Sequence, residues 1–226
     1  PPGEPDAVST VHELGEIFAQ LDPLRELLEK CLDGWQPPAL VVVGNEKSGK
    51  SSQLERLCMM PMFPHAEEIC TRLPIEVRLR RGPSKAPRLE TFNKQSNQTE
   101  GEIIDVPMET ANIDVRREME RLVKLQNHAV TGVCSDRMII LHVQSPNVPN
   151  LDLVDLPGMV TTAAAGEPDD MPQQTRALVT AQIDQHKDHS LFLCAVDATT
   201  APNTSTAMQL LKEKRVLDKT IGVITM

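Results

Sequence analysis

The sequence predicts an α/β fold in which helices cover both faces of a mostly parallel sheet. Strand-like and helical patterns largely alternate along the chain, an order that is typical of parallel strands joined by helices. Two continuous apolar runs, Ala39–Val43 and Leu191–Val196, have the composition of strands that are buried on both faces. The first of these runs leads directly into a loop with two glycines and then into a helical pattern.

Composition excludes several classes of protein. The 226 residues include 23 basic and 32 acidic side chains, which give a net charge of −9, and only four Phe, one Trp and no Tyr. We therefore expect no nucleic-acid partner, because that function needs a basic surface with stacking rings. The apolar runs are far shorter than the ~20 residues that cross a bilayer, and no secretory signal opens the chain. Five cysteines lie far apart without a CxxC pair, so a reduced, cytoplasmic protein is expected.

The beginning of the chain differs from the rest. The expected divisions are a flexible leader at 1–9, a helical segment at 10–34 and a main domain at 35–226. Thr10 and Glu13 have the spacing of a capping box, and apolar residues then recur every three or four positions as far as Leu32. This amphipathic stripe must be buried, either on the chain's own core or on a partner helix from outside it. Because the chain starts at Pro1 and stops at Met226, directly after an apolar run, we expect a fragment.

Local patterns predict the first elements of the main domain. The Val-rich run Ala39–Val43 ends in glycine, as a buried strand does. A helix is expected over Lys50–Met60, with its apolar residues on one face and a proline just past its end. Ile75–Leu79 alternates apolar and polar residues, which indicates an edge or half-buried strand. Gly82–Asn112 is polar and broken by Pro and Gly, which favours a surface insertion with little regular structure.

The remaining elements follow from the same patterns. Asp114–Asn127 and Gln173–His186 have the periodicity of amphipathic helices. Ile139–Val143 and Leu151–Val154 are expected to be strands, separated by a turn rich in Pro and Asn. The last expected elements are a buried strand at Leu191–Val196, a helix at Met208–Val216 and a strand at Ile221–Thr225. The histidines at 186 and 189 are too few for a metal site and are interpreted as solvated surface at a helix end.

The strongest functional signal is a complete GxxxxGK[ST] motif between a buried strand and a helix. Its glycines let the backbone wrap around a phosphate chain, so that several N–H groups and the helix N-terminus face the anion. Lys50 would neutralise the outer phosphates, and the Ser51 hydroxyl would bind Mg²⁺. The residues expected to contact the nucleotide in this loop are Gly44, Asn45, Glu46, Lys47, Ser48, Gly49, Lys50, Ser51 and Ser52.

Two weaker signals lie downstream of the loop. Asp155 and Gly158 form a DxxG sequence at the end of a strand. The carboxylate can hold Mg²⁺ through water, and the glycine amide can meet a terminal phosphate with no side chain in the way. A simple Pro-Gly turn is the alternative, but the position after the phosphate loop favours a sensor of the third phosphate. Thr71, in a polar stretch before the next strand, could close over Mg²⁺.

With these motifs in place, the chain resembles the GTPase domain of the dynamin superfamily from about Ala39 to Met226. The specific stretches are Val43–Ser52, Cys70–Pro74, Leu151–Met159 and Thr220–Thr225. The resemblance implies a P-loop NTPase fold with a Ras-like sheet. It also implies GTP as substrate, Mg²⁺ as cofactor, and hydrolysis coupled to self-assembly, usually on membranes. Residues Val11–Leu32 look like the family's N-terminal element, which joins a small helical bundle.

The same resemblance implies roles for individual residues. Thr71 would be the first-switch threonine, and Asp155 and Gly158 would belong to the second switch. Thr225 would begin the guanine-recognition motif, but Met226 follows it and the chain ends before the motif's aspartate. The catalytic candidates are Glu46, Lys47, Lys50, Thr71 and Gly158, and the metal candidates are Ser51, Thr71 and Asp155.

The chain departs from the dynamin pattern in its loop. Dynamin has glutamine and serine where this chain has Glu46 and Lys47. The family's glutamine orients the attacking water, and Glu46 could do the same. The loop Asp197–Ser205 also lacks an obvious match to the aspartate by which dynamin holds a monovalent cation. One hypothesis joins these facts: the Lys47 ammonium replaces the cation, at the position where atlastins and guanylate-binding proteins carry an arginine finger. The alternative is that Lys47 points into water.

Two other functions stay open on the sequence alone. One is a nucleotide-binding assembly scaffold that does not hydrolyse, and the other is an ATP-using kinase or ATPase on the same loop. The expected partners are GTP and further copies of the G domain. Membrane lipids or the cytoskeleton would be reached through regions absent from this chain, which would place the cytoplasmic protein peripherally on membranes.

Overall fold

The computed structural model describes residues 38–58, 63, 71–129, 131–199, 201 and 204–225. The expected leader at 1–9 and the expected helical segment at 10–34 lie outside these residues, as do Met59 and Met60, Cys70 and Met226.

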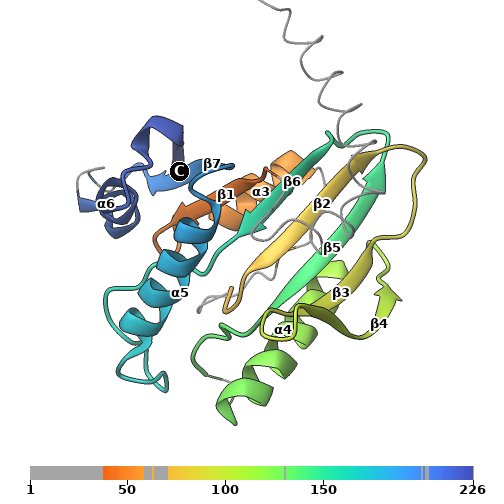
Figure 1. Ribbon diagram of the computed structural model, residues 1–226, viewed down its shortest axis with the longest axis horizontal. Helices are drawn as coiled ribbons and strands as arrows, with labels where there is room; N and C mark the ends of the chain where they lie inside the picture. The colour runs from red at the N-terminus through yellow and green to blue at the C-terminus, as the bar shows by residue number, and fades with distance from the viewer. Residues whose placement is uncertain are drawn as a thin grey trace, which may run out of the picture.

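An eight-stranded sheet runs through the described part of the protein (Figure 1). Its strand order is β4-β3-β5-β2-β6-β1-β7-β8. The strands are β1 (Leu40–Gly44), β2 (Ile75–Arg81), β3 (Arg88–Asn93), β4 (Gln98–Asp105), β5 (Arg137–Ser145), β6 (Leu151–Asp155), β7 (Leu191–Asp197) and β8 (Thr220–Thr225). Every strand expected from the sequence is confirmed, and β3 and β4 are additional.

The directions of the strands divide the sheet into two parts. Strands β6, β1, β7 and β8 run parallel to one another, and β2 runs parallel to β5. In contrast, β2 is antiparallel to β6, and β3 is antiparallel to both β5 and β4. The mostly parallel sheet is thus confirmed for the part that carries the glycine-rich loop, while the whole sheet is mixed. The connections from β3 to β4 and from β5 to β6 are short. A parallel crossover needs a dozen residues or more, so the strand after each of these connections runs in the opposite direction to the strand before it.

Strands β3 and β4 show that the expectation for Gly82–Asn112 was wrong. They form a hairpin whose turn is stabilised by the Asn93 side chain, which accepts hydrogen bonds from two turn N–H groups at 2.8 and 3.1 Å. Asn97 has a φ of 53°, a left-handed conformation that asparagine tolerates. Leu89 faces the core and is 3% exposed. Polarity here reflects a place near the edge of the sheet rather than an absence of structure.

Strand β4 is the edge of the described sheet beyond β3. Almost all of it is exposed, and Glu102 and Asp105 are among its exposed residues. The pairing with β3 shifts register between Leu89 and Thr91, so the stretch of β4 around Gly101 bulges. Gly101 has a φ of 78°, which glycine adopts without the steric cost of a Cβ atom.

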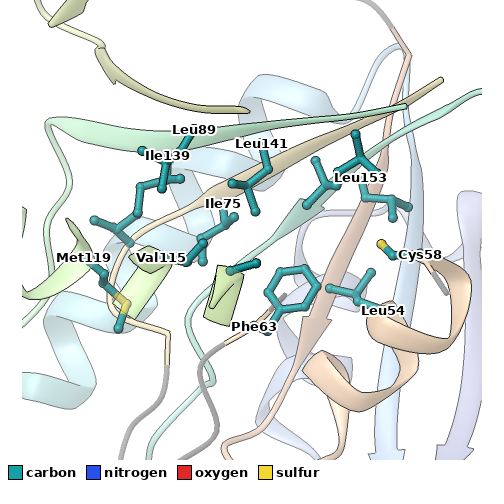
Figure 2. Close-up of a cluster of buried hydrophobic side chains, with 14 of the residues drawn as sticks. Leu54, Cys58, Phe63, Ile75, Leu89, Val115, Met119, Ile139, Leu141 and Leu153 are labelled. Atoms are coloured by element: carbon teal, nitrogen blue, oxygen red, sulfur yellow. The ribbon is translucent and has the colours of Figure 1, made fainter. Parts of the chain in front are cut away.

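Helices cover both faces of the sheet, as predicted. They are α3 (Lys50–Cys58), α4 (Ala111–Asn127), α5 (Met171–His186) and α6 (Thr206–Glu213). The core beneath α3 and α4 includes Leu54 and Val115, and Figure 2 shows these side chains converging with Leu141 and Leu153 of the sheet. A second core under α5 and α6 includes Ile183 and packs on the other face of β1 and β7 (Figure 1).

Two boundaries in this framework differ from the sequence expectations. Helix α6 begins at Thr206, two residues earlier than expected, because the Ser205 hydroxyl caps it by accepting a hydrogen bond from the Met208 N–H at 3.3 Å. It ends at Glu213 rather than Val216. Strand β2 lies between β5 and β6, so of the two readings of its alternation the half-buried strand is confirmed and the edge strand is wrong.

The described cysteines Cys58, Cys134 and Cys194 are buried free thiols. Within the described residues, no helix combines the length and the apolar character that a membrane span requires.

His186 corrects the expectation of a solvated histidine pair. It lies at the end of α5 and is only 8% exposed. Its Nδ1 is 3.3 Å from the Ser190 hydroxyl, which also accepts a hydrogen bond from the Ala39 N–H at 3.1 Å. Burial, with a smaller contribution from His189, lowers the pKa of His186 to about 4. The histidine is therefore a neutral part of the packing between α5 and the starts of β1 and β7.

Acidification should therefore destabilise the protein through His186. The unfolded chain binds a proton near pH 6.5, whereas the folded chain resists it until about pH 4. The stabilisation is fully present above pH 6.5 and is lost as pH falls, by at most about 1.4 kcal/mol per pH unit. Urea unfolding at several pH values should show a smaller loss for His186→Gln than for the parent. His128→Asn, at an exposed helix end, is the control; identical pH profiles for parent and His186→Gln would contradict the assignment.

Candidate nucleotide-binding site

The glycine-rich loop lies between the end of β1 and the start of α3. Gly44 is the last residue of β1, and Lys50 is the first of α3. Lys47 and Gly49 have φ values of 59° and 74°, so the chain reverses within the loop. The Lys50 residue is 7% exposed, and the first turn of α3 has N–H groups that no partner within the helix can satisfy. This combination of a buried lysine and a helix N-terminus is what a phosphate site requires.

Close packing fixes the start of the loop. A Cβ atom on Gly44 would lie 2.5 Å from the Ser48 Oγ and 2.8 Å from the Ala195 carbonyl oxygen. Only glycine fits at this position without displacing β7 or the loop. The Ser48 Oγ is buried and has no hydrogen-bond partner among the described residues, so its hydrogen-bonding capacity is available to a ligand.

Two side chains brace the loop from the protein side. The Asn45 Oδ1 accepts hydrogen bonds from the Thr206 hydroxyl at 2.8 Å and from the Ala207 N–H at 3.1 Å, at the start of α6. The Thr225 hydroxyl donates to the Ser48 carbonyl oxygen at 2.8 Å from the end of β8. Both residues were predicted to contact the nucleotide. In this structure their side chains hold the loop, and the N-terminus of α6 is the partner that sequence reasoning missed.

The Asp155–Gly158 segment lies against the same loop. The Glu46 N–H donates to the Met159 carbonyl oxygen at 2.9 Å, and the Met159 N–H donates to the Gly44 carbonyl oxygen at 3.0 Å. A Cβ atom on Gly158 would lie 2.8 Å from the Glu46 Cα and 3.2 Å from the Lys50 Nζ. The structure therefore brings together the two motifs that the sequence placed more than a hundred positions apart.

Asp155 and Thr71 meet beneath this contact. The Thr71 hydroxyl donates to the Asp155 Oδ2 at 3.1 Å, and both residues are buried. The Asp155 Oδ1 is also buried but has no hydrogen-bond partner among the described residues. Burial raises the pKa of Asp155 to about 6, although the charge of Lys50 and the hydrogen bond from Thr71 oppose this rise. A free carboxylate oxygen in this position is suited to a hydrated cation.

The residues present fit Mg²⁺ better than a metal held in a protein cage. In the described part of the chain, no group of three or more His, Cys, Asp or Glu side chains gathers as a metal site. Mg²⁺ instead binds through one or two protein oxygens together with waters and phosphate oxygens. Ser51 at the start of α3 and the Thr71–Asp155 pair supply hard oxygen atoms of this kind.

A cavity of about 220 Å³ lies beside the loop. It is lined by residues 45–48 of the loop and by the end of β7 with the residues that follow, among them Asp197 and Thr199. The Asp197 carboxylate accepts a hydrogen bond from the Thr199 N–H at 2.7 Å and another from its hydroxyl. These bonds, chiefly the side-chain one, lower the pKa of Asp197. Asp197 was not predicted to be a partner of the loop, yet it lines this cavity together with exposed Lys47.

The predicted residues do not all share one environment. Glu46 is half-buried, and its backbone forms the contact with Gly158. Ser52 is exposed on the first turn of α3. Arg72 and Glu167 were not predicted as site residues, although Arg72 lies within the Cys70–Pro74 stretch that carries the resemblance. Arg72 follows Thr71 in the chain, and the Glu167 carboxylate pairs with the Arg72 guanidinium.

Comparison with known proteins adds an independent line of observation. Residues 40–226 match the family model described as Dynamin family. The chain is 34% identical over 225 residues to dynamin-related protein 3A of Arabidopsis thaliana, which covers 96% of this chain and 25% of that protein. It is 32% identical over 211 residues to the interferon-induced GTP-binding protein Mx of Siniperca chuatsi, and the match covers 91% of this chain and 31% of that protein. It is 33% identical over 193 residues to interferon-induced GTP-binding protein Mx1 of Mus musculus, and the match covers 83% of this chain and 28% of that protein. The chain spans between a quarter and a third of these relatives.

Substitution of Gly158 should disconnect the two motifs. In Gly158→Ala the new methyl group must displace the Glu46 backbone or the Lys50 ammonium, with strain of about 1–3 kcal/mol. We expect the affinity for a magnesium nucleoside triphosphate to fall about ten- to a hundredfold while the protein stays folded. Isothermal titration calorimetry measures this loss. Gly222→Ala, in β8 with nothing within 4 Å of the added Cβ, is the matched control, and equal affinities for the two variants would refute the argument.

Proposed function

The chain belongs to the dynamin family, and on that premise we propose that it binds GTP with Mg²⁺ and hydrolyses it. The observation that carries the proposal is the contact of Gly158 with Glu46 and Lys50, next to the buried Thr71–Asp155 pair. A phosphate loop, a lysine and a glycine amide at the next strand end are the parts that P-loop GTPases use. The Mx relatives are named as GTP-binding proteins, which supports guanine rather than adenine as the base.

The proposed reaction is attack of water on the terminal phosphorus, in line with the bond to the leaving diphosphate. The ammonium of Lys50 and the loop N–H groups would stabilise the charge that develops on the phosphate oxygens. Ser51, Thr71 and Asp155 would hold Mg²⁺, which when bound neutralises charge on the phosphates. The Gly158 N–H would contact the third phosphate, and Glu46 would orient the attacking water.

Self-association is proposed as part of the same function. Lys47 is exposed and Glu46 is half-buried at the mouth of the loop, so a second copy of the domain could reach both. Action at membranes, with a cytoplasmic and peripheral location, would depend on the regions by which the relatives exceed this chain.

Nucleotide turnover tests the proposal directly. We expect the chain to release phosphate from GTP at millimolar Mg²⁺, and Lys50→Ala to lose at least about a hundredfold in turnover because the outer phosphates lose their countercharge. Lys85→Ala, at an exposed position outside the site, should match the parent. Tight GTP binding without phosphate release would instead favour the assembly scaffold. The argument for that alternative is the negative charge of Glu46, which is unfavourable near phosphate. A preference for ATP in a competition assay would favour the kinase or ATPase alternative.

The two readings of Lys47 predict different effects of monovalent cations on GTP turnover. If the Lys47 ammonium supplies the positive charge that dynamin obtains from a bound cation, the parent should hydrolyse GTP equally in Na⁺, K⁺ and N-methylglucamine. Lys47→Ser should then lose about ten- to a hundredfold in rate, less than a lost arginine finger, because lysine lacks the planar fork. Its position in the cavity with Asp197 and Thr199 motivates the hypothesis. Strong dependence of the parent on Na⁺ or K⁺ would remove Lys47 from this role.

A further inference from the structure

Arg72 anchors the residue next to Thr71 to three separate segments. Its N–H is 3.3 Å from the Met119 sulfur on α4, and its carbonyl oxygen accepts a hydrogen bond from the Cys134 N–H at 2.8 Å. The guanidinium donates to the Gly132 carbonyl oxygen at 3.3 Å and to the Glu167 Oε1 at 2.5 Å. The side chain is only 10% exposed, so these contacts are internal.

Glu167 completes a closed ring of contacts. Its second carboxylate oxygen, Oε2, accepts a hydrogen bond from the Gly132 N–H at 3.0 Å. Its side chain is 6% exposed. Burial acts to raise the pKa of Glu167, but the hydrogen bonds from Arg72 and Gly132 outweigh it and hold the pKa below its usual value. The carboxylate is thus charged, and both of its oxygens are occupied by groups from two other loops.

The ring joins two segments that would flank the third phosphate in the proposed function. Glu167 lies in the segment that runs from Gly158 to the start of α5, and Arg72 is bonded to Thr71 through one peptide unit. A threonine beside so firmly held a residue has little freedom to move its hydroxyl away from the Asp155 Oδ2. Removal of one charged partner would leave the other buried and unpaired, which would free this part of the chain.

We propose that Glu167 is a positioning residue, which through Arg72 holds Thr71 against Asp155 before any nucleotide binds. The metal-binding side of the site is thereby assembled in advance, and the segment after Gly158 is mechanically connected to it. The effect on turnover rests on the proposed GTPase function, but the effect on the free protein does not.

Hydrogen exchange of the nucleotide-free full chain tests the structural half. In Glu167→Gln the amides of residues 71–73 and 132–134 should exchange about five- to thirtyfold faster than in the parent. Asp152→Asn is the matched control, because Asp152 forms a similarly buried ion pair with Arg80 at 2.7 Å at the far end of β6; it should leave those amides unchanged. If Glu167→Gln does not fold, the double variant Arg72→Gln/Glu167→Gln, which removes both charges, should show the same acceleration.

The kinetics of GTP hydrolysis test whether Glu167 acts as a positioning residue in turnover. We expect kcat for GTP to fall about tenfold in Glu167→Gln, with the affinity for GDP within about twofold of the parent, because GDP lacks the third phosphate. The double variant should be no worse than the single ones, since residues that act as a unit are not additive. If the amides of residues 71–73 exchange at the parental rate in both variants, the proposal is overturned, even if the parent hydrolyses GTP. If the parent does not hydrolyse GTP, the proposed function is wrong, but the amide hydrogen exchange would still decide whether Glu167 holds Thr71 in place.

Discussion

Just past the ends of β1 and β6, the backbone of Gly158 comes so close to the glycine-rich loop that a Cβ atom would lie 2.8 Å from the Glu46 Cα. The rest of the site depends on this approach. The parallel pairing of Leu40 with Leu153 sets the register of the two strands, and the backbone bonds between Glu46, Met159 and Gly44 extend it past the strand ends. The function proposed above requires this separation, because the Lys50 ammonium, the Gly158 N–H and the Asp155 carboxylate would have to reach one phosphate chain together.

Local signals account for most of the fold that was predicted. The continuous apolar run of β1 and the periodic apolar stripe of α4 are patterns among residues close together in the sequence, so the sequence alone indicates both elements. The hairpin of β3 and β4 was missed because an exposed edge strand has no apolar alternation to detect, and β4 is polar along much of its length. The antiparallel pairing of β2 with β6 joins residues about 80 positions apart, such as Ile75 and Asp155. Strand direction is therefore a property of the assembled sheet, and no local pattern contains it.

The candidate site was predictable where a motif names its residues, and only there. Lys50 and Ser51 follow from the spacing of the glycine-rich loop, and Thr71 follows from the resemblance to a known family rather than from spacing. Asn45 bonds to residues about 160 positions away, and Arg72 bonds to a carboxylate 95 positions away. Those partners are ordinary Thr and Glu residues in loops or at a helix start. Their importance comes from burial and geometry, which appear only when the chain is folded.

The edge formed by β4 has a consequence for how copies of this domain can associate. An exposed strand normally invites another strand to pair with it. Here the bulge at Gly101 interrupts the row of backbone groups, and two such edges side by side would bring Glu102 and Asp105 of each copy together. The bulge and the repulsion between these carboxylates therefore disfavour strand-to-strand pairing at this edge of the described sheet.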